Sequence, residues 1–82
     1  MPNSAANPWF EALKASGWKE VVPFVEFRQG HRTIIFDTSS WMELYNARDS
    51  RIADVPIPED GREEEALILI EQLFAAENAA AK

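Results

Sequence analysis

The chain of 82 residues contains no cysteine, one histidine and only three glycines. The absence of cysteine excludes disulfides, thiolate metal sites and cysteine nucleophiles. No phosphate-binding glycine loop, zinc-protease motif or serine-hydrolase motif occurs. The single histidine, His31, lies between Gly30 and Arg32 and is interpreted as a solvated turn residue. We therefore expect no enzymatic activity, no cofactor and no bound metal ion.

Long apolar runs are also absent. The longest, residues 66–70, is far shorter than the ~20 apolar residues that span a bilayer as a helix. Residues 1–7 have neither the basic stretch nor the apolar segment of a secretory signal. These features favour a cytoplasmic protein that does not associate with membranes.

Negative charge is present in excess and is concentrated in one part of the chain. The formal net charge is −6, and residues 52–82 carry eight acidic residues against Arg62 and Lys82. Such a chain is repelled by nucleic acid phosphates, so direct binding to DNA or RNA is not expected. The remaining arginines are interpreted as ion-pair partners of nearby acids in the middle of the chain: Arg28, Arg32, Arg48 and Arg51.

The first regular element is expected to be a helix over residues 8–15. Asn7 can cap its free N–H groups, and proline suits the first helical position because its missing N–H would have no partner there. Gly17 is placed to end the helix in a left-handed conformation, which should fold Trp18 back onto Leu13.

A β-hairpin is predicted next. Residues 21–28 and 32–37 are rich in β-branched and aromatic side chains, and Gly30 supplies the turn between them. The expected register places Phe27 opposite Arg32. A three-residue loop, which would shift the pairing by one residue, is the alternative.

A short second helix is predicted over residues 41–47. Ser40 followed by Glu43 matches a capping box, in which each residue satisfies a free N–H group of the other. Trp41, Leu44 and Tyr45 would share one face of this helix by their spacing. Trp41 and Tyr45 are candidate interface anchors, because Trp and Tyr are enriched among the residues that dominate binding energy.

The last helix follows a predicted ordered loop over residues 48–58, which contains two prolines. Asp60 is a candidate cap, and the glutamates of the first turn suit the positive end of the helix dipole. Ile68 and Leu69 widen the apolar arc beyond the usual core-facing width. The residues predicted to face the core are Leu67, Ile70, Leu73 and Phe74.

These elements predict an α+β fold, a β-hairpin packed against two or three helices in the order α-β-β-α-α. Residues 1–82 form a single small domain, with loose tails at 1–6 and 78–82. A lone hairpin is marginal in water, so its second face needs either the middle helix or another chain as a cover.

The acidic run before and within the last helix is the main candidate binding surface. It lacks the alternating oxygen ligands of an EF-hand calcium loop. Three consecutive glutamates also span about 200° of a helix, so some of them must face solvent. The predicted partner-binding residues are Glu59, Asp60, Glu63, Glu64, Glu65, Trp41 and Tyr45.

Composition and charge together favour a non-enzymatic protein-binding domain. We expect a small acidic inhibitor or adaptor that engages a basic surface on a protein partner, such as a complex that handles nucleic acid. Phage-encoded antagonists are one group of this kind. The alternative is a self-associating structural or accessory protein that dimerises through its hairpin.

Overall fold

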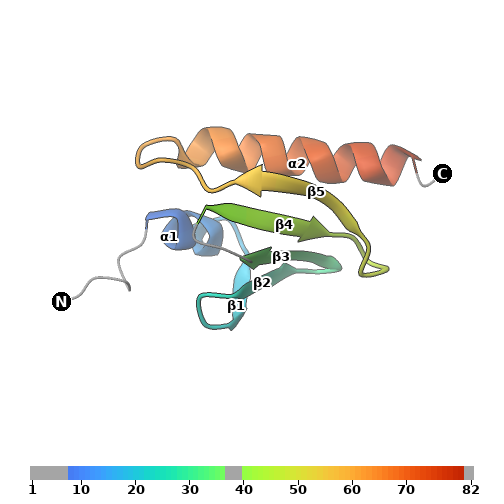
Figure 1. Ribbon diagram of the computed structural model, residues 1–82, viewed down its shortest axis with the longest axis horizontal. Coiled ribbons are helices and arrows are strands. Elements are labelled where there is room, and N and C mark those ends of the chain that lie inside the picture. Colours follow the sequence, from blue (N-terminus) through green and yellow to red (C-terminus); the bar gives the residue numbers. More distant parts are fainter. Residues whose placement is uncertain (1–7, 37–39, 81–82) are drawn as a thin grey trace.

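The computed structural model describes residues 8–36 and 40–80 of the chain. Its elements follow the order α-β-β-β-β-β-α, with five strands between two helices (Figure 1). The strands form one antiparallel sheet in which spatial order equals chain order. The predicted class α+β therefore holds, but the predicted architecture of a two-stranded hairpin with two or three helices is wrong.

The first helix, α1, spans Pro8–Ala15, as predicted. The Trp18 N–H donates to the Leu13 carbonyl at 2.9 Å, and the Gly17 N–H donates to the Lys14 carbonyl at 3.1 Å. Gly17 has φ +94°, so this ending is the predicted Schellman motif. Trp18 and Leu13 are both buried. The proposed cap Asn7 lies outside the described residues.

The segment predicted as the first hairpin strand is divided by a turn into β1 (Lys19–Val22) and β2 (Glu26–Gln29). Strand β3 (Arg32–Phe36) pairs with β2 in a register that places Phe27 opposite Ile34 and Gln29 opposite Arg32. The expected pairing of Phe27 with Arg32 is therefore wrong by two residues. Only Gly30 and His31 lie between β2 and β3. Gly30 has φ +62°, a left-handed conformation that two-residue hairpin turns require.

The predicted middle helix is a strand, β4 (Trp41–Tyr45). Met42 and Leu44 are buried while Trp41 is exposed, which is the two-residue alternation of a strand. The paired strand β5 (Arg51–Pro56) replaces the predicted loop. Since β5 is the last strand of the sheet, Pro56 is tolerated at its end.

The β4–β5 turn is organised by one side chain. The Asn46 Oδ1 atom accepts hydrogen bonds from the N–H groups of Arg48 at 2.9 Å and Ser50 at 3.0 Å. Asp49 adopts φ +60°, a conformation that Asp tolerates better than most residues. Two strands therefore meet where the sequence was interpreted as the end of a helix followed by a loop.

The last helix, α2, spans Glu63–Ala80. The Ala66 N–H donates to the carbonyl of Arg62 at 3.2 Å, so Arg62, and not Asp60 as predicted, holds the capping position. Of the predicted stripe, Ile70 and Phe74 are buried, whereas Leu67 and Leu73 flank the core. Ala66 of the same helix is also buried.

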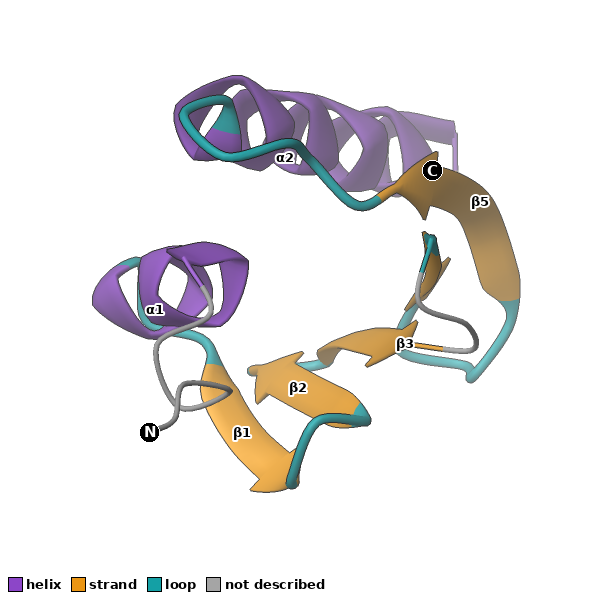
Figure 2. Cartoon of the chain, turned by 60° about the vertical axis from the view of Figure 1, so that its left-hand side comes forward, coloured by secondary structure: helices purple, strands orange, loops and turns teal. Residues whose placement is uncertain are grey.

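Both helices lie on the same side of the sheet, which curls around them (Figure 2). The core fills the space between these layers. It contains two tryptophans, Trp9 and Trp18, together with side chains from every strand except β1. Within residues 8–36 and 40–80, no helix lies over the opposite face of the sheet (Figure 2). This face carries the alternate residues of the strands, Trp41 and Tyr45 among them.

Candidate partner-binding surface

Helix α2 has a second apolar face that the sheet does not cover. An α-helix turns by about 100° per residue, so a run of five apolar residues cannot all face one layer. Ala66 and Ile70 take the buried side. As a result Ile68 is 56% exposed and Leu69 41% exposed.

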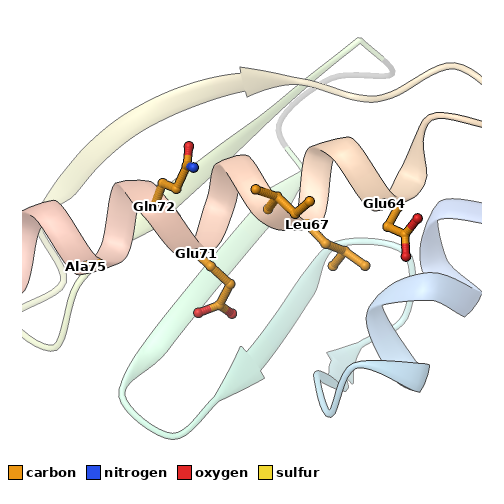
Figure 3. A pocket seen from close by; sticks show the side chains of 6 residues that line it. Glu64, Leu67, Glu71, Gln72 and Ala75 are labelled. Atoms are coloured by element: carbon orange, nitrogen blue, oxygen red, sulfur yellow. The ribbon is translucent and has the colours of Figure 1, made fainter.

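A shallow, open hollow of about 470 Å³, called the groove below, lies along this face between side chains of α2 alone. Its walls come from positions one turn apart on α2, so the groove follows the helix axis (Figure 3). Apolar side chains line the middle of the groove and carboxylates stand beside them. The lining residues are Glu64, Leu67, Ile68, Glu71, Gln72 and Ala75.

The charge around this groove is strongly negative. From residue 59 to residue 77 the chain carries seven acidic residues and a single arginine, Arg62. Arg62 pairs with Glu65 at 3.2 Å, and Arg32 pairs with Glu71 at 2.8 Å. Among residues 8–36 and 40–80, no cation forms an ion pair with Glu64. Most of the negative charge on this surface is therefore not neutralised by ion pairs among the described residues.

The predicted acidic residues lie together at the start of α2. Glu59 and Asp60 are in the preceding loop, and both are exposed, as are Glu64 and Glu65. Glu63 is half-buried, and its carboxylate accepts a hydrogen bond from the Gly61 N–H at 3.0 Å. These residues continue directly into the groove through Glu64.

The predicted aromatic residues lie elsewhere. Trp41 and Tyr45 are on β4 and face away from the helices, so they do not join the acidic residues in one site. The sequence analysis placed these two residues on one face of a helix. They also share one face of the strand, because they are four positions apart and side chains alternate between faces. Leu44, expected beside them, is buried on the opposite face.

Tyr45 belongs to a polar cluster on the outer sheet face. Its hydroxyl donates to Glu43 Oε1 at 2.7 Å, and Arg51 Nη1 lies 3.2 Å from Glu43 Oε2. The hydrogen bond to Glu43, with desolvation, raises the pKa of Tyr45 above its ordinary value of 10.0. The arginines in the middle of the chain were predicted to pair with nearby acids, and for Arg51 the partner is Glu43. The Arg51–Glu43 pair joins β5 to β4 and stabilises the sheet, whereas the Tyr45–Glu43 hydrogen bond lies within β4. Trp41, on the same face of β4, is exposed.

A smaller polar depression lies between the β2–β3 turn, the β4–β5 turn and α2. Its main cation, Arg32, lies over the rings of Trp18 and Phe74, with centroid distances of 5.3 and 5.1 Å. Arg32 also donates to Gln29 and Glu71, and Asn46 donates to Glu77 at 2.9 Å. These polar groups form hydrogen bonds with one another. We therefore interpret them as a structural network that holds α2 against the β2–β3 and β4–β5 turns.

Two further findings bear on chemistry. Within the described ranges, no group of three or more His, Asp or Glu side chains is arranged to hold a metal ion. No helix in that part of the chain is long and apolar enough to cross a membrane. His31 is exposed at the β2–β3 turn, where the sequence predicted it.

Several residues of the groove were not predicted from the sequence. Ile68 was recognised as excess apolar surface, but Glu71, Gln72 and Ala75 were not connected to it. The available signal was their spacing of three and four residues from Glu64 and Ile68, which places all of them on one helix face.

Comparison with known proteins adds no relative. No family model matches the sequence, and no match was found among curated proteins or solved structures. Functional inference for this chain therefore rests on its own surfaces.

Proposed function

We propose that the chain is a non-enzymatic protein-binding domain that engages a basic, partly apolar segment of a protein partner through α2. The supporting observation is the groove along α2, where exposed Ile68 adjoins the unpaired carboxylate of Glu64. Contiguous exposed apolar surface rimmed by polar groups is typical of interaction sites.

Charge complementarity defines the partner. A segment that places Lys or Arg at the ends of a short apolar stripe satisfies both the carboxylates and the apolar floor of the groove. An amphipathic helix laid along α2 presents such a stripe at three- and four-residue spacing. Acidic residues beyond the groove, Glu59 and Asp60, would speed the encounter through long-range attraction.

The biological role that we propose is inhibition or adaptation of a protein that handles nucleic acid. Such proteins carry basic surfaces, because they neutralise phosphates. A small acidic domain that covers such a surface competes with nucleic acid for it, as a phage-encoded antagonist would. Direct binding of nucleic acid by this chain is not part of the proposal, given the net charge of −6.

A peptide titration followed by nuclear magnetic resonance tests the surface. The probe is a designed amphipathic helical peptide with Leu on one face and Lys at its borders, and the control peptide keeps the Leu pattern with Glu in place of Lys. We expect the Lys peptide to shift backbone signals around Glu64, Ile68 and Ala75. Added salt should weaken this binding, because exposed charges are screened.

Two matched variants sharpen the result. Glu64→Lys removes a carboxylate that has no ion-pair partner among the described residues, whereas Glu11→Lys makes the same charge change at an exposed position of α1. Only Glu64→Lys should substantially weaken binding of the Lys peptide. Equal loss in both variants would reduce the effect to net charge, and signal changes centred away from α2 would refute the proposed surface.

A further inference from the structure

The turn between β1 and β2 is an exposed apolar segment. Residues 21–25, Val-Val-Pro-Phe-Val, contain four large hydrophobic side chains with exposures between 41% and 53%. Phe24 is the most exposed of them at 53%, and it contacts the ring of Phe10 at a centroid distance of 5.9 Å. An uninterrupted run of this kind on the surface marks an interaction site more often than scattered apolar residues do.

Phe24 is held in an unfavourable backbone conformation. The Val25 N–H donates to the Val22 carbonyl at 2.9 Å, which closes a four-residue turn with Pro23 in second place and Phe24 in third. Proline there and φ +62° at Phe24 are features of a type II turn, which favours Gly or Asn in third place. A bulky residue with positive φ is a genuine outlier, and such strain concentrates at functional positions.

The neighbouring strand edge is open. Strand β1 is the first strand of the sheet and pairs only with β2 among the residues described. The irregular pairing between Glu20 and Val22 breaks the regularity of this edge. The apolar turn and the open edge together form one continuous surface, which we call the β1 surface (residues 19–25).

The distribution of charge permits a second copy of the chain to approach this surface. Residues 8–28 carry three acidic and three basic residues, so the β1 end of the molecule is neutral. Figures 1 and 2, which differ by a rotation about the vertical axis, both place α2 at the top and the β1–β2 turn at the bottom. A second copy of this acidic chain can therefore approach the β1 surface while the two α2 helices stay on the outside, where their repulsion is smallest.

We propose that two copies of the chain associate through their β1 surfaces about a two-fold axis. Phe24 of each copy packs against the apolar turn of the other, since one patch must be complementary to itself in such an interface. The strained turn displays Phe24 outward for this contact. The resulting dimer carries two outward-facing acidic helices, so a partner with two basic segments would bind it with the added strength of bivalency.

Analytical ultracentrifugation of the full chain tests this proposal without any partner. We expect the average mass to rise toward that of two chains between about 1 μM and 1 mM protein. Phe24→Asn should raise the dissociation constant at least about tenfold. Because Asn accepts positive φ, this variant should retain the melting temperature of the monomer.

Two more variants separate the interface from folding. Val25→Lys places a like charge on both sides of the two-fold contact and should also abolish the dimer. Ile68→Asn makes a comparable polar change on α2 and should leave the mass distribution unchanged. A parent chain that stays monomeric over the whole range, or a Phe24→Asn variant that dimerises like the parent, would overturn the proposal.

Discussion

At the scale of single residues, backbone conformation separates two kinds of position in this chain. Gly17 and Gly30 have positive φ at a helix end and at a hairpin turn, where glycine is the residue that physics favours. Phe24 has positive φ with a bulky side chain. Gly17 also sits against the Gln29 side chain, since an added Cβ would lie 3.0 Å from its Nε2 atom. The two glycines adopt positive φ without strain, whereas the same conformation at Phe24 is strained and leaves its side chain exposed.

Tyr45 offers a titration that reports one hydrogen bond. The chain has a single tyrosine, so phenolate absorbance follows this residue alone. Because the hydrogen bond to Glu43 raises its pKa, half-ionisation should occur above the ordinary value of 10.0. Glu43→Gln should bring the midpoint back toward that value.

The sign of the accompanying stability change follows from linkage. The folded-state pKa lies above that of the unfolded chain, so the contribution of Tyr45 is complete below about pH 10 and is lost as pH rises through the folded-state pKa. A titration midpoint that Glu43→Gln leaves unchanged would show that the hydrogen bond does not persist in solution.

At the scale of elements, the two helices with start or stop signals could be predicted, whereas β4 and β5 could not. Helix α2 has eighteen residues with capping and charge signals, and α1 has a glycine stop. Strand β4 has only five residues, over which Trp41, Leu44 and Tyr45 fit helical spacing while the same segment also fits strand alternation. Tertiary pairing with β3 and β5 decided between the two periods. Strand β5 was predicted as a loop because of Pro56, since proline argues against a strand unless that strand lies at the edge of the sheet.

The buried side of α2 is tested by Phe74→Ala. Phe74 is 3% exposed, contacts Trp18 at a centroid distance of 6.1 Å and lies beneath Arg32. Its truncation should lower the free energy of unfolding by about 3–5 kcal/mol, as measured by chemical denaturation.

Ile68→Ala is the matched control on the exposed side of the same helix. It should change the free energy of unfolding by no more than about 0.5 kcal/mol, because surface substitutions away from packed features have small effects. Similar losses in both variants would contradict the assigned orientation of α2.

At the scale of the whole molecule, an acidic helix lies on one side and a neutral apolar turn on the other (Figure 1). The acidic side could be predicted from the sequence, because the excess of carboxylates in residues 52–82 is visible in composition alone. The apolar turn could not. Residues 21–25 have the composition of a buried strand, and nothing in that pattern reveals that a turn interrupts it or that Phe24 points outward.

Quantitative capture from an extract of the source organism shows whether α2 binds a basic protein partner, as we propose. The parent chain, a Glu64→Lys/Ile68→Asn double variant and the Glu11→Lys control are immobilised in parallel, and bound proteins are quantified by mass spectrometry. The account predicts a basic protein that the parent and the control retain, that salt releases, and that the double variant loses. A partner retained equally by all three chains, or one whose binding ignores salt, would contradict it.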